Sequence, residues 1–286
     1  MALIDHIIRC NTWNPRNFRP FFVAGQPVGR VRSALIDRLM EFPDLFAPQG
    51  GGITLSDRLD SPEARSDAFR PVADKLASDG VVGRLRGEDY RVVARWGAPI
   101  LMAIDRAVVP ALGIRAFGIH VNGLVRRDDG VHLWIGKRAA DRPIEPGKLD
   151  NIVAGGQPAH LSLSQNLVKE ADEEAGLPPD LALRAKPVGA LTYCMEEGVG
   201  LKRDTLFLYD LELPESVAVR PHDGEMESFA LMPLLEVIAR LKGGFDFKFN
   251  VALVLIDFLI RHGVVTPETE PDYLDLVTGL HTALET

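Results

Sequence analysis

The feature that most constrains this chain is a glycine-rich loop followed by a helix with clustered acids and then a helix stop. Gly155-Gly156 precedes the run Lys169–Leu177, whose letters are KEADEEAGL. Residues three and four apart share one face of a helix, so the three glutamates of this run are expected to point the same way. They are Glu170, Glu173 and Glu174. Gly176 then acts as a helix terminator, so loop, helix and stop form one unit.

Clustered carboxylates on one helical turn repel one another, and a bound cation removes that cost. Mg²⁺ and Mn²⁺ prefer oxygen ligands and can also hold the phosphate oxygens of a substrate. An acidic run is also typical of a solvated helix face, which is the alternative interpretation. The adjoining apolar stripe of Val168, Ala171 and Ala175 favours a helix packed on a sheet. We therefore predict that the three glutamates bind a divalent metal.

At these residues the chain resembles the Nudix hydrolases. Their signature is a glycine, five residues, a glutamate, seven residues and then Arg-Glu-apolar-x-Glu-Glu-x-Gly-apolar. Laid on this sequence, the first glycine is Gly155 and the final run is Lys169–Leu177. Two positions depart, because the first glutamate falls on Leu161 and the arginine on Lys169. Lysine keeps the charge of arginine but lacks its planar fork, so we expect a differently braced loop around retained metal-binding acids.

The resemblance implies a fold and a set of roles. The fold class is α/β with a mixed α+β sheet, arranged as the Nudix α/β/α sandwich. The implied metal ligands are Glu170, Glu173, Glu174 and the backbone carbonyl of Gly155. Glu173 and Glu174 are the implied catalytic acids, with Glu174 orienting or deprotonating water. Other members place this base in a downstream loop, where Glu225 and Glu227 are candidates here, with plain exposed loop acids as the alternative.

Cationic and backbone groups near the loop are expected to bind the phosphates of the ligand. The residues predicted for this role are Lys148, Gly156 and Arg138, with Lys202-Arg203 as further candidates. Lys148 is favoured because it shortly precedes the glycine loop. Most lysines and arginines are solvated surface groups, which is the alternative for each cation.

Segments outside the box are similar to one Nudix subgroup, related to the domain fused to thiamin pyrophosphokinase in fungi. The matching segments are 21–31, 42–46, 147–156 and 247–263. We expect an N-terminal α/β accessory domain at residues 1–111 and a Nudix hydrolase domain with a C-terminal helix at 112–286. The first is predicted to act as a lid, a specificity element or a dimerisation element.

Local patterns predict the elements of the accessory domain. Helices are expected at 3–10, 28–41 and 62–78, with strands at 21–23, 81–85 and 90–96. In the second domain, alternating apolar residues on both sides of Asp128-Asp129-Gly130 predict a hairpin. Further strands are expected at 185–193, 206–213 and 228–231, with a helix at 234–242 and a buried helix at 251–260.

Composition excludes some classes of function. The chain has 286 residues, 46% of them hydrophobic, and a formal net charge of −8. This acidic balance argues against binding a nucleic acid polymer, whereas a small polyphosphate is compatible with it if a metal and a few cations act locally. The sequence shows no membrane-spanning run and no secretory leader, so we expect a cytoplasmic protein without a membrane partner. Cys10 and Cys194 offer no disulfide framework and no zinc motif, and Cys194 is expected to have a packing role.

The residues do not define the substrate beyond a compound X linked to diphosphate. The subgroup resemblance implies thiamin diphosphate or its oxidised analogues, a housekeeping role. Nucleoside diphosphate derivatives, including oxidised nucleotides, ADP-ribose and NADH-type dinucleotides, compete with it. A non-catalytic sensor of a phosphorylated metabolite is the alternative, favoured by the departures at Leu161 and Lys169. A homodimer is an expectation from the family.

Overall fold

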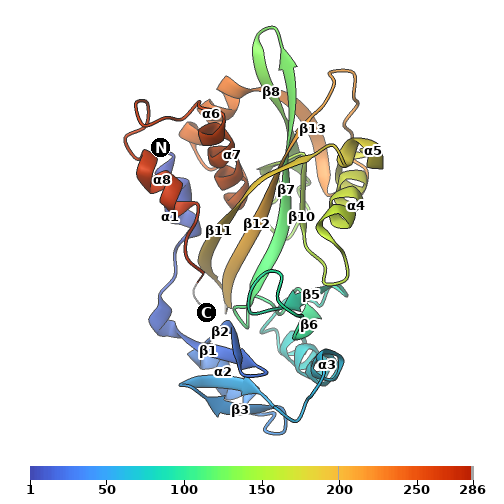
Figure 1. The fold of residues 1–286 in the computed structure, drawn as a ribbon, viewed down its shortest axis with the longest axis vertical. Helices are drawn as coiled ribbons and strands as arrows, with labels where there is room; N and C mark the ends of the chain where they lie inside the picture. Colours follow the sequence, from blue (N-terminus) through green and yellow to red (C-terminus); the bar gives the residue numbers. More distant parts are fainter. Residues whose placement is uncertain (199, 285–286) are drawn as a thin grey trace.

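A seven-stranded mixed sheet forms the centre of the molecule (Figure 1). The computed structural model describes residues 1–198 and 200–284. The strand order is β11-β12-β7-β8-β13, with β10 added beside β7 and β9 beside β8. Among the described residues of this sheet, β7 and β12 pair in parallel and the other strand pairs are antiparallel. The strands are β7 (Arg115–Arg127), β8 (Gly130–Arg138), β9 (Leu149–Asp150), β10 (Val153–Gly156), β11 (Lys186–Glu197), β12 (Gly200–Glu212) and β13 (Met226–Pro233).

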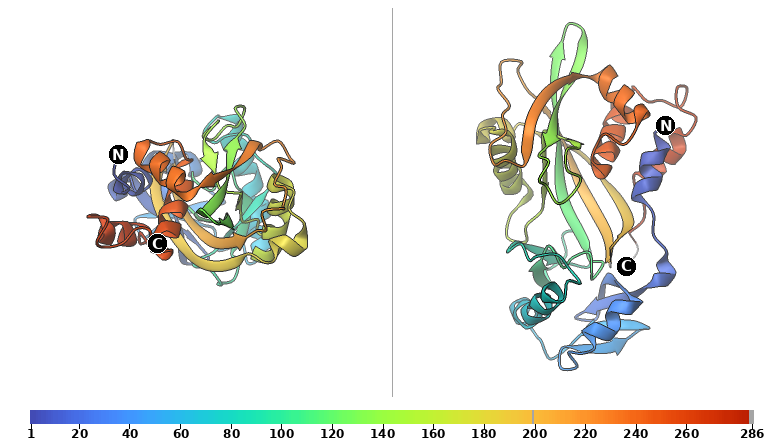
Figure 2. Two further views of the ribbon diagram at one scale, coloured as in Figure 1. Left: turned by 90° about the horizontal axis from the view of Figure 1, so that it is seen from above. Right: turned by 180° about the vertical axis from the view of Figure 1, so that it is seen from behind.

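Helices cover both faces of this sheet (Figures 1 and 2). One face carries α4 (Leu163–Ala175) and α5 (Pro179–Ala182). The other carries α1 (Ile4–Cys10), α6 (Leu234–Gly243), α7 (Phe249–Arg261) and α8 (Tyr273–Gly279). Each layer has its own cluster of buried apolar side chains against the sheet. The predicted α/β/α sandwich with a mixed sheet is therefore confirmed.

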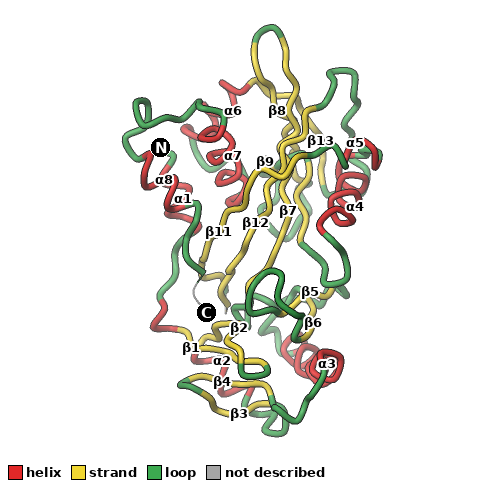
Figure 3. Tube along the Cα trace, in the orientation of Figure 1, coloured by secondary structure: helices red, strands yellow, loops and turns green. Residues whose placement is uncertain are grey.

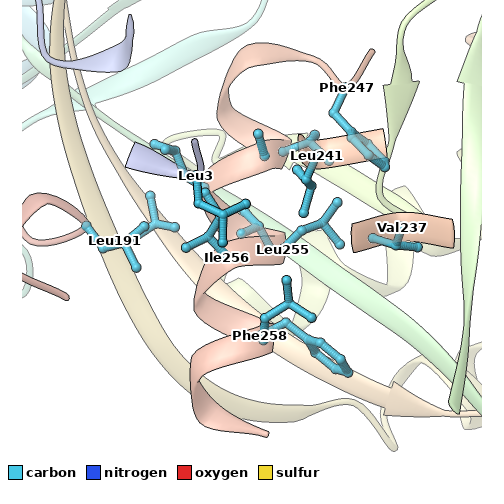
Figure 4. Packing of buried hydrophobic residues seen from close by; sticks show 14 of the residues in the cluster. Leu3, Leu191, Val237, Leu241, Phe247, Leu255, Ile256 and Phe258 are labelled. Atoms are coloured by element: carbon cyan, nitrogen blue, oxygen red, sulfur yellow. The ribbon is translucent and has the colours of Figure 1, made fainter. Parts of the chain in front are cut away.

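The helix α7 is the centre of the larger core (Figure 4). Every side chain from Phe249 to Leu259 is buried, because α7 lies between the sheet and the helices α1 and α6. Leu255 and Ile256 lie beside Leu3 of the N-terminal segment in this cluster. Burying each such side chain stabilises the fold by about 1.5 to 3 kcal/mol. The described residues contain no helix with the length and apolarity needed to cross a bilayer.

A smaller module lies at one end of the sandwich, in the lower part of Figure 1. Its main sheet has the order β2-β1-β4-β3, in which β1 and β4 are parallel. A separate pair, β5 and β6, lies beside the helix α3 (Figure 3). Its elements are η1 (Pro15–Asn17), β1 (Phe18–Val23), β2 (Gln26–Arg32), α2 (Ser33–Leu39), β3 (Phe46–Gln49), β4 (Gly52–Leu55), α3 (Pro62–Ser78), β5 (Asp89–Val92) and β6 (Met102–Asp105). We refer to residues 15–110 as the N-terminal module.

The helix α1 precedes this module but does not pack in it. Leu3, Ile7 and Cys10 belong to the core around α7, on the far layer of the sandwich. The backbone N–H of Glu196 in β11 also donates to the carbonyl of Thr12 at 2.9 Å. The chain thus begins on the sandwich, crosses to the N-terminal module and returns to the sandwich at β7. The predicted division between residues 111 and 112 stays a prediction.

The predicted helix at 28–41 is wrong in its first half. Residues Gln26–Arg32 form β2, and only Ser33–Leu39 is helical. Ala24 and Gly25 have positive φ values of 48° and 72°, which closes a tight hairpin with β1. Val28 and Val31 are three apart, as on a helix, but a bulge opposite Phe21 and Phe22 lets both be buried from a strand.

The predicted strand at 81–85 is also wrong. The backbone N–H groups of Val81 and Val82 donate to the carbonyl of Leu76, so these residues close the end of α3. Gly80 and Gly87 have φ values of 69° and 70°, which favours a loop between them. The strand expected at 90–96 is present as the shorter β5. By contrast, α3 spans 62–78 as predicted, because Ser61 caps it by accepting from the N–H of Ala64 at 3.1 Å.

Candidate active site

The acidic helix α4 begins and ends on local signals. Ser162 and Gln165 form a reciprocal capping box at its start, and Gly176 ends it with a φ of 63°. Ala171 and Ala175 are buried against the sheet, as the apolar stripe predicts, while Val168 is only partly buried. The helix packs beside β10, which contains the glycine loop. This packing brings the acids of α4 next to the backbone of that loop.

Glu170 lies directly against Gly155. A Cβ atom on residue 155 would come within 2.3 Å of the carboxyl carbon of Glu170, so only glycine leaves room for this side chain. Lys169 donates to Glu170 Oε1 at 3.1 Å. Burial raises the pKa of Glu170, and Lys169 opposes that shift. The structure thus places Glu170 beside the glycine loop, and its role as a metal ligand stays a prediction.

Glu174 is the most buried acid of the helix, with 2% of its surface exposed. The N–H of Ala154 in β10 donates to Glu174 Oε2 at 2.8 Å. Burial raises the pKa of Glu174 well above its usual value, and the nearby acids Asp150 and Glu225 raise it further. A carboxyl group crowded in this way is neutral or neutralised by a cation.

Glu173 faces away from these two acids. Its side chain is 45% exposed and forms an ion pair with Lys169 at 2.7 Å. It does not line the cavity that Glu170 and Glu174 share. The structure therefore brings together two of the three predicted helix acids, and Glu173 lies on the outer side of the helix.

A cavity of about 530 Å³ lies between the sandwich and the N-terminal module and is lined by residues of both. Four predicted site residues besides the helix acids line it: Gly155, Gly156, Arg138 and Glu225. Lys148 does not, because its Nζ donates to the carbonyl of Phe245 at 2.5 Å. Arg203, proposed with Lys202, is buried and donates to the carbonyl of Gly113, whereas Lys202 lines the cavity.

An ion-pair cluster fixes the wall opposite α4. Arg138 Nη1 donates to Asp150 Oδ2 at 2.9 Å and to Glu225 Oε1 at 3.0 Å. Lys248 Nζ also donates to Asp150 Oδ2, at 3.2 Å. Burial alone would raise the pKa of Asp150, but Lys248 and Arg138 hold it below its usual value. Glu227 instead pairs with Lys137 at 3.0 Å and does not line the cavity, which distinguishes it from Glu225.

Sequence reasoning missed Lys248 and Asp150 as parts of this wall. Lys248 stands between the buried residues Phe247 and Phe249, which was a signal that its charge would need a buried partner. No local pattern identified Asp150 as that partner, because 98 residues separate the two in sequence.

The N-terminal module touches the glycine loop through Tyr90. A Cβ atom on residue 156 would lie 1.5 Å from the hydroxyl oxygen of Tyr90, so the two residues are in close contact. Burial raises the pKa of Tyr90, which keeps its hydroxyl neutral. Tyr90 also forms an isolated β-bridge with Pro158. The loop is therefore packed against a residue from outside the sandwich.

Arg91, the next residue, donates to the carbonyls of the same loop. Its Nη2 lies 3.3 Å from the oxygen of Pro158, 3.1 Å from that of Ala159 and 3.0 Å from that of Leu161. The guanidinium also stacks over Trp96, 4.9 Å from the ring centroid. The sequence alone did not identify Tyr90 or Arg91 as contacts of this loop, because the two segments are about seventy residues apart.

The donor set of the cavity fits a hard divalent cation. It offers carboxylate oxygens from Glu170, Glu174 and Glu225, and burial and nearby acids raise the pKa values of the first two. Within residues 1–198 and 200–284, no three His, Cys, Asp or Glu residues are gathered closely enough to be a preformed metal site. The fit therefore rests on the crowded acids and on the glycine that admits Glu170.

Comparison with known proteins decides the family. A model described as a domain of unknown function, DUF4743, matches residues 2–116. The chain is 41% identical to "Nudix hydrolase 24, chloroplastic" of Arabidopsis thaliana over 283 residues, 98% of this chain and 77% of that protein. It is also 41% identical to "Nudix hydrolase 20, chloroplastic" of the same plant, with the same coverage. The chain belongs to the Nudix hydrolase family.

Two further likenesses extend this comparison. An uncharacterized protein of Saccharomyces cerevisiae is 38% identical over 235 residues, covering 77% of this chain and 68% of that protein. Among solved structures, DR0079 from Deinococcus radiodurans matches with a TM-score of 0.45 and 21% identity, over 59% of this chain and 97% of that one. The predicted family and enzyme class, a Nudix pyrophosphohydrolase, are confirmed by the named relatives.

In this Nudix hydrolase the two departures from the signature have a structural counterpart. Leu161 occupies the position of the first glutamate and offers no carboxylate; its backbone carbonyl accepts from Arg91 and from Gln157 Nε2 at 2.8 Å. Lys169 holds Glu170 and Glu173 by single hydrogen bonds. The main donor to the loop is thus Arg91 of the N-terminal module.

Proposed function

We propose that this Nudix hydrolase cleaves the diphosphate linkage of a small metabolite with the help of Mg²⁺ or Mn²⁺. The observation that carries the proposal is the juxtaposition of Glu170 and Glu174 with Gly155 in one cavity. These acids repel one another where they are buried, so a divalent cation between them would be bound favourably. The missing Cβ of Gly155 lets the Glu170 carboxyl group approach the loop backbone closely.

Five residues that line the cavity have a role in this proposal. Glu170 and Glu174 would hold the cation, which when bound neutralises phosphate oxygens and acidifies a water molecule. The N–H of Ala154 fixes the orientation of the Glu174 carboxyl group. Arg138 fixes one oxygen of Glu225, whose side chain is 30% exposed. We assign Glu225 as the base that orients or deprotonates water, because it is more accessible than Glu174.

For the group X we propose thiamin diphosphate or its oxidised analogues. The support is the resemblance of segments 21–31, 147–156 and 247–263 to the subgroup related to fungal thiamin pyrophosphokinase. The cavity volume of about 530 Å³ is in the range of small-ligand sites. Nucleoside diphosphate derivatives of similar size are the competing substrates.

A sensor without catalytic activity is the second candidate. It is favoured by Lys169, whose Nζ pairs with Glu170 at 3.1 Å and with Glu173 at 2.7 Å and so competes with a cation for these acids. Such a protein would bind a phosphorylated metabolite and release it unchanged.

The test is a panel of diphosphate compounds, with thiamin diphosphate and its oxidised analogues included, incubated with purified protein and Mg²⁺ or Mn²⁺. We expect metal-dependent release of monophosphate or orthophosphate, lowered at least about a hundredfold by Glu174→Gln or Glu225→Gln. Glu212→Gln, an exposed acid on the same sheet, is the control and should retain activity. Binding of panel compounds without any product would instead support the sensor.

A further inference from the structure

The charge of the cavity lining is opposite to that of the whole protein. Seven arginines and lysines line the cavity, against five aspartates and glutamates. The chain as a whole has a formal net charge of −8. A cavity with a positively charged lining in an otherwise acidic protein favours the binding of an anionic ligand.

Three of these cations come from the N-terminal module. Arg84 and Arg86 lie on the loop that joins α3 to β5, drawn as loop in Figure 3, and Arg106 follows β6. They line the same cavity as Glu170 and Glu174. The cavity thus has an acidic part on α4 and a basic part on the N-terminal module.

Arg84 and Arg86 differ from the other cations of the lining in their partners. The others are Arg106, Arg138, Arg142, Lys202 and Lys248, and each has an acid or a carbonyl within hydrogen-bond distance. Within residues 1–198 and 200–284, the side chains of Arg84 and Arg86 form no hydrogen bond or ion pair with the protein. Their guanidinium groups are therefore available to a ligand.

The backbone that carries these two arginines is held in place. Asp105 Oδ2 accepts from the backbone N–H of Arg86 at 2.8 Å and from that of Gly87 at 2.7 Å. Arg106 Nη1 pairs with Glu88 at 2.7 Å, which ties the loop to the end of β6. Gly87 has a φ of 70°, so it accommodates the turn without strain. An anchored backbone lowers the entropy that is lost when the side chains close on a ligand.

We propose that Arg84 and Arg86 form an oxyanion subsite that binds a phosphate group of the substrate. Guanidinium groups suit this role because they donate to phosphate oxygens in pairs. The phosphate is either the terminal one of the diphosphate that is cleaved or a further one on X. This inference rests on the proposed function and gives the N-terminal module a role in substrate recognition.

The experiment measures binding of inorganic pyrophosphate by calorimetry, with EDTA present to exclude divalent metals. Wild-type protein is expected to bind, and the double variant Arg84→Gln/Arg86→Gln is expected to bind at least about tenfold more weakly, because charge-assisted hydrogen bonds are lost. Arg58→Gln is the matched control, since Arg58 is an exposed arginine of the same module outside the cavity, and it should bind as wild type does. Equal binding by wild type and the double variant, or no binding by wild type, overturns the proposal.

Binding of two nucleotides shows which phosphate of the substrate the two arginines contact. ADP carries only the diphosphate, and adenosine 3′-phosphate 5′-diphosphate carries one phosphate more. Equal weakening of both in the double variant supports the terminal phosphate, and weakening of the second alone supports a further phosphate on X. If neither is weakened, the subsite is refuted.

Failure of the subsite and failure of the proposed activity remain distinguishable. Mn²⁺ binding, measured by electron paramagnetic resonance, should be unchanged in the double variant because Glu170 and Glu174 are intact. If no panel compound is cleaved but pyrophosphate binding still depends on the two arginines, the activity is wrong and the subsite stands. If cleavage occurs and the double variant has an unchanged KM, the activity stands and the subsite is wrong.

Discussion

The guanidinium of Arg91 lies 3.0 Å from the carbonyl oxygen of Leu161, across the boundary between the N-terminal module and the sandwich. The same nitrogen also reaches the carbonyls of Pro158 and Ala159. These residues lie between the glycine loop and the acidic helix. The position of the loop in the Nudix box therefore depends on a residue that is not part of the box.

Replacing Arg91 should lower both activity and stability. Arg91→Met keeps much of the side-chain volume but removes the donor to three carbonyls, so the loop loses its position relative to Glu170. We expect kcat/KM to fall by about ten- to a hundredfold, with the free energy of unfolding lowered by about 1 to 3 kcal/mol. Steady-state kinetics and urea unfolding measure both quantities.

Arg95→Met is the control for this change, because Arg95 is an exposed arginine four residues further along. It should leave kcat/KM unchanged. Addition of methylguanidinium should restore part of the activity of Arg91→Met. Wild-type activity in Arg91→Met would show that the brace is dispensable.

Gly156→Ala should be destabilising because of Tyr90. The added Cβ would overlap the hydroxyl oxygen of Tyr90 at 1.5 Å, so one of the two segments has to move. We expect a loss of about 1 to 3 kcal/mol in the free energy of unfolding. The second change Tyr90→Ala should recover part of that loss, which a double-mutant cycle in urea detects.

Gly243→Ala provides the comparison, because nothing lies within 4 Å of a Cβ at that position. It should be close to neutral. Additive effects of Gly156→Ala and Tyr90→Ala would contradict the contact.

Glu174→Gln should stabilise the metal-free protein while it abolishes metal binding. Burial and neighbouring acids raise the pKa of Glu174, so without a cation the folded protein at neutral pH either holds an unfavourable charge or takes up a proton, and both lower stability. Glutamine keeps an oxygen to accept from the N–H of Ala154. We expect the Tm measured in EDTA to rise by a few degrees, about what 1 kcal/mol gives in a chain of this size. A lower Tm would show that the carboxylate is not under electrostatic strain.

His120 should make stability depend on pH below neutrality. Burial lowers the pKa of His120 to about 4 from 6.5, and its Nδ1 lies 2.8 Å from Asn151 Oδ1. The unfolded chain takes up this proton between pH 6.5 and 4 and the folded chain does not, so the unfolded state is favoured as the pH falls. The stability from His120 is complete above about pH 6.5 and falls by about 3 kcal/mol towards pH 4.

Urea unfolding at several pH values tests this in wild type and in His120→Gln, which cannot take up the proton. The variant should lose stability less steeply between pH 6.5 and 4. Identical slopes for the two proteins would assign the pH dependence to other groups.

Local patterns were sufficient to predict much of the sandwich. The helix α4 has a capping box and a glycine stop within its own sequence, and the β7–β8 hairpin has alternating residues around a turn. The helix α7 is apolar on every side, which indicates burial. These features depend on neighbours within a few residues, so one sequence is enough to identify them.

The contacts that complete the site depend on residues far apart in the chain. Glu173 and Glu174 are adjacent and chemically equal, yet only the second is turned into the cavity, because the packing of α4 on β10 sets which face is buried. Asp150 meets Lys248 across 98 residues. The valines of 81–85 fit a strand pattern, but in the structure Val81 and Val82 close α3 through backbone hydrogen bonds to Leu76. No periodicity encodes such pairings.

The crossing of the chain from α1 to the N-terminal module and back has a consequence for how the protein comes apart. Leu3 and Ile7 pack in the core around α7, so a shortened chain that starts at β7 would lose part of this core as well as Arg91, which braces the loop. Folding of the sandwich and packing of the N-terminal module against it are thereby linked. Heat should melt the molecule in a single calorimetric transition, with no surviving half.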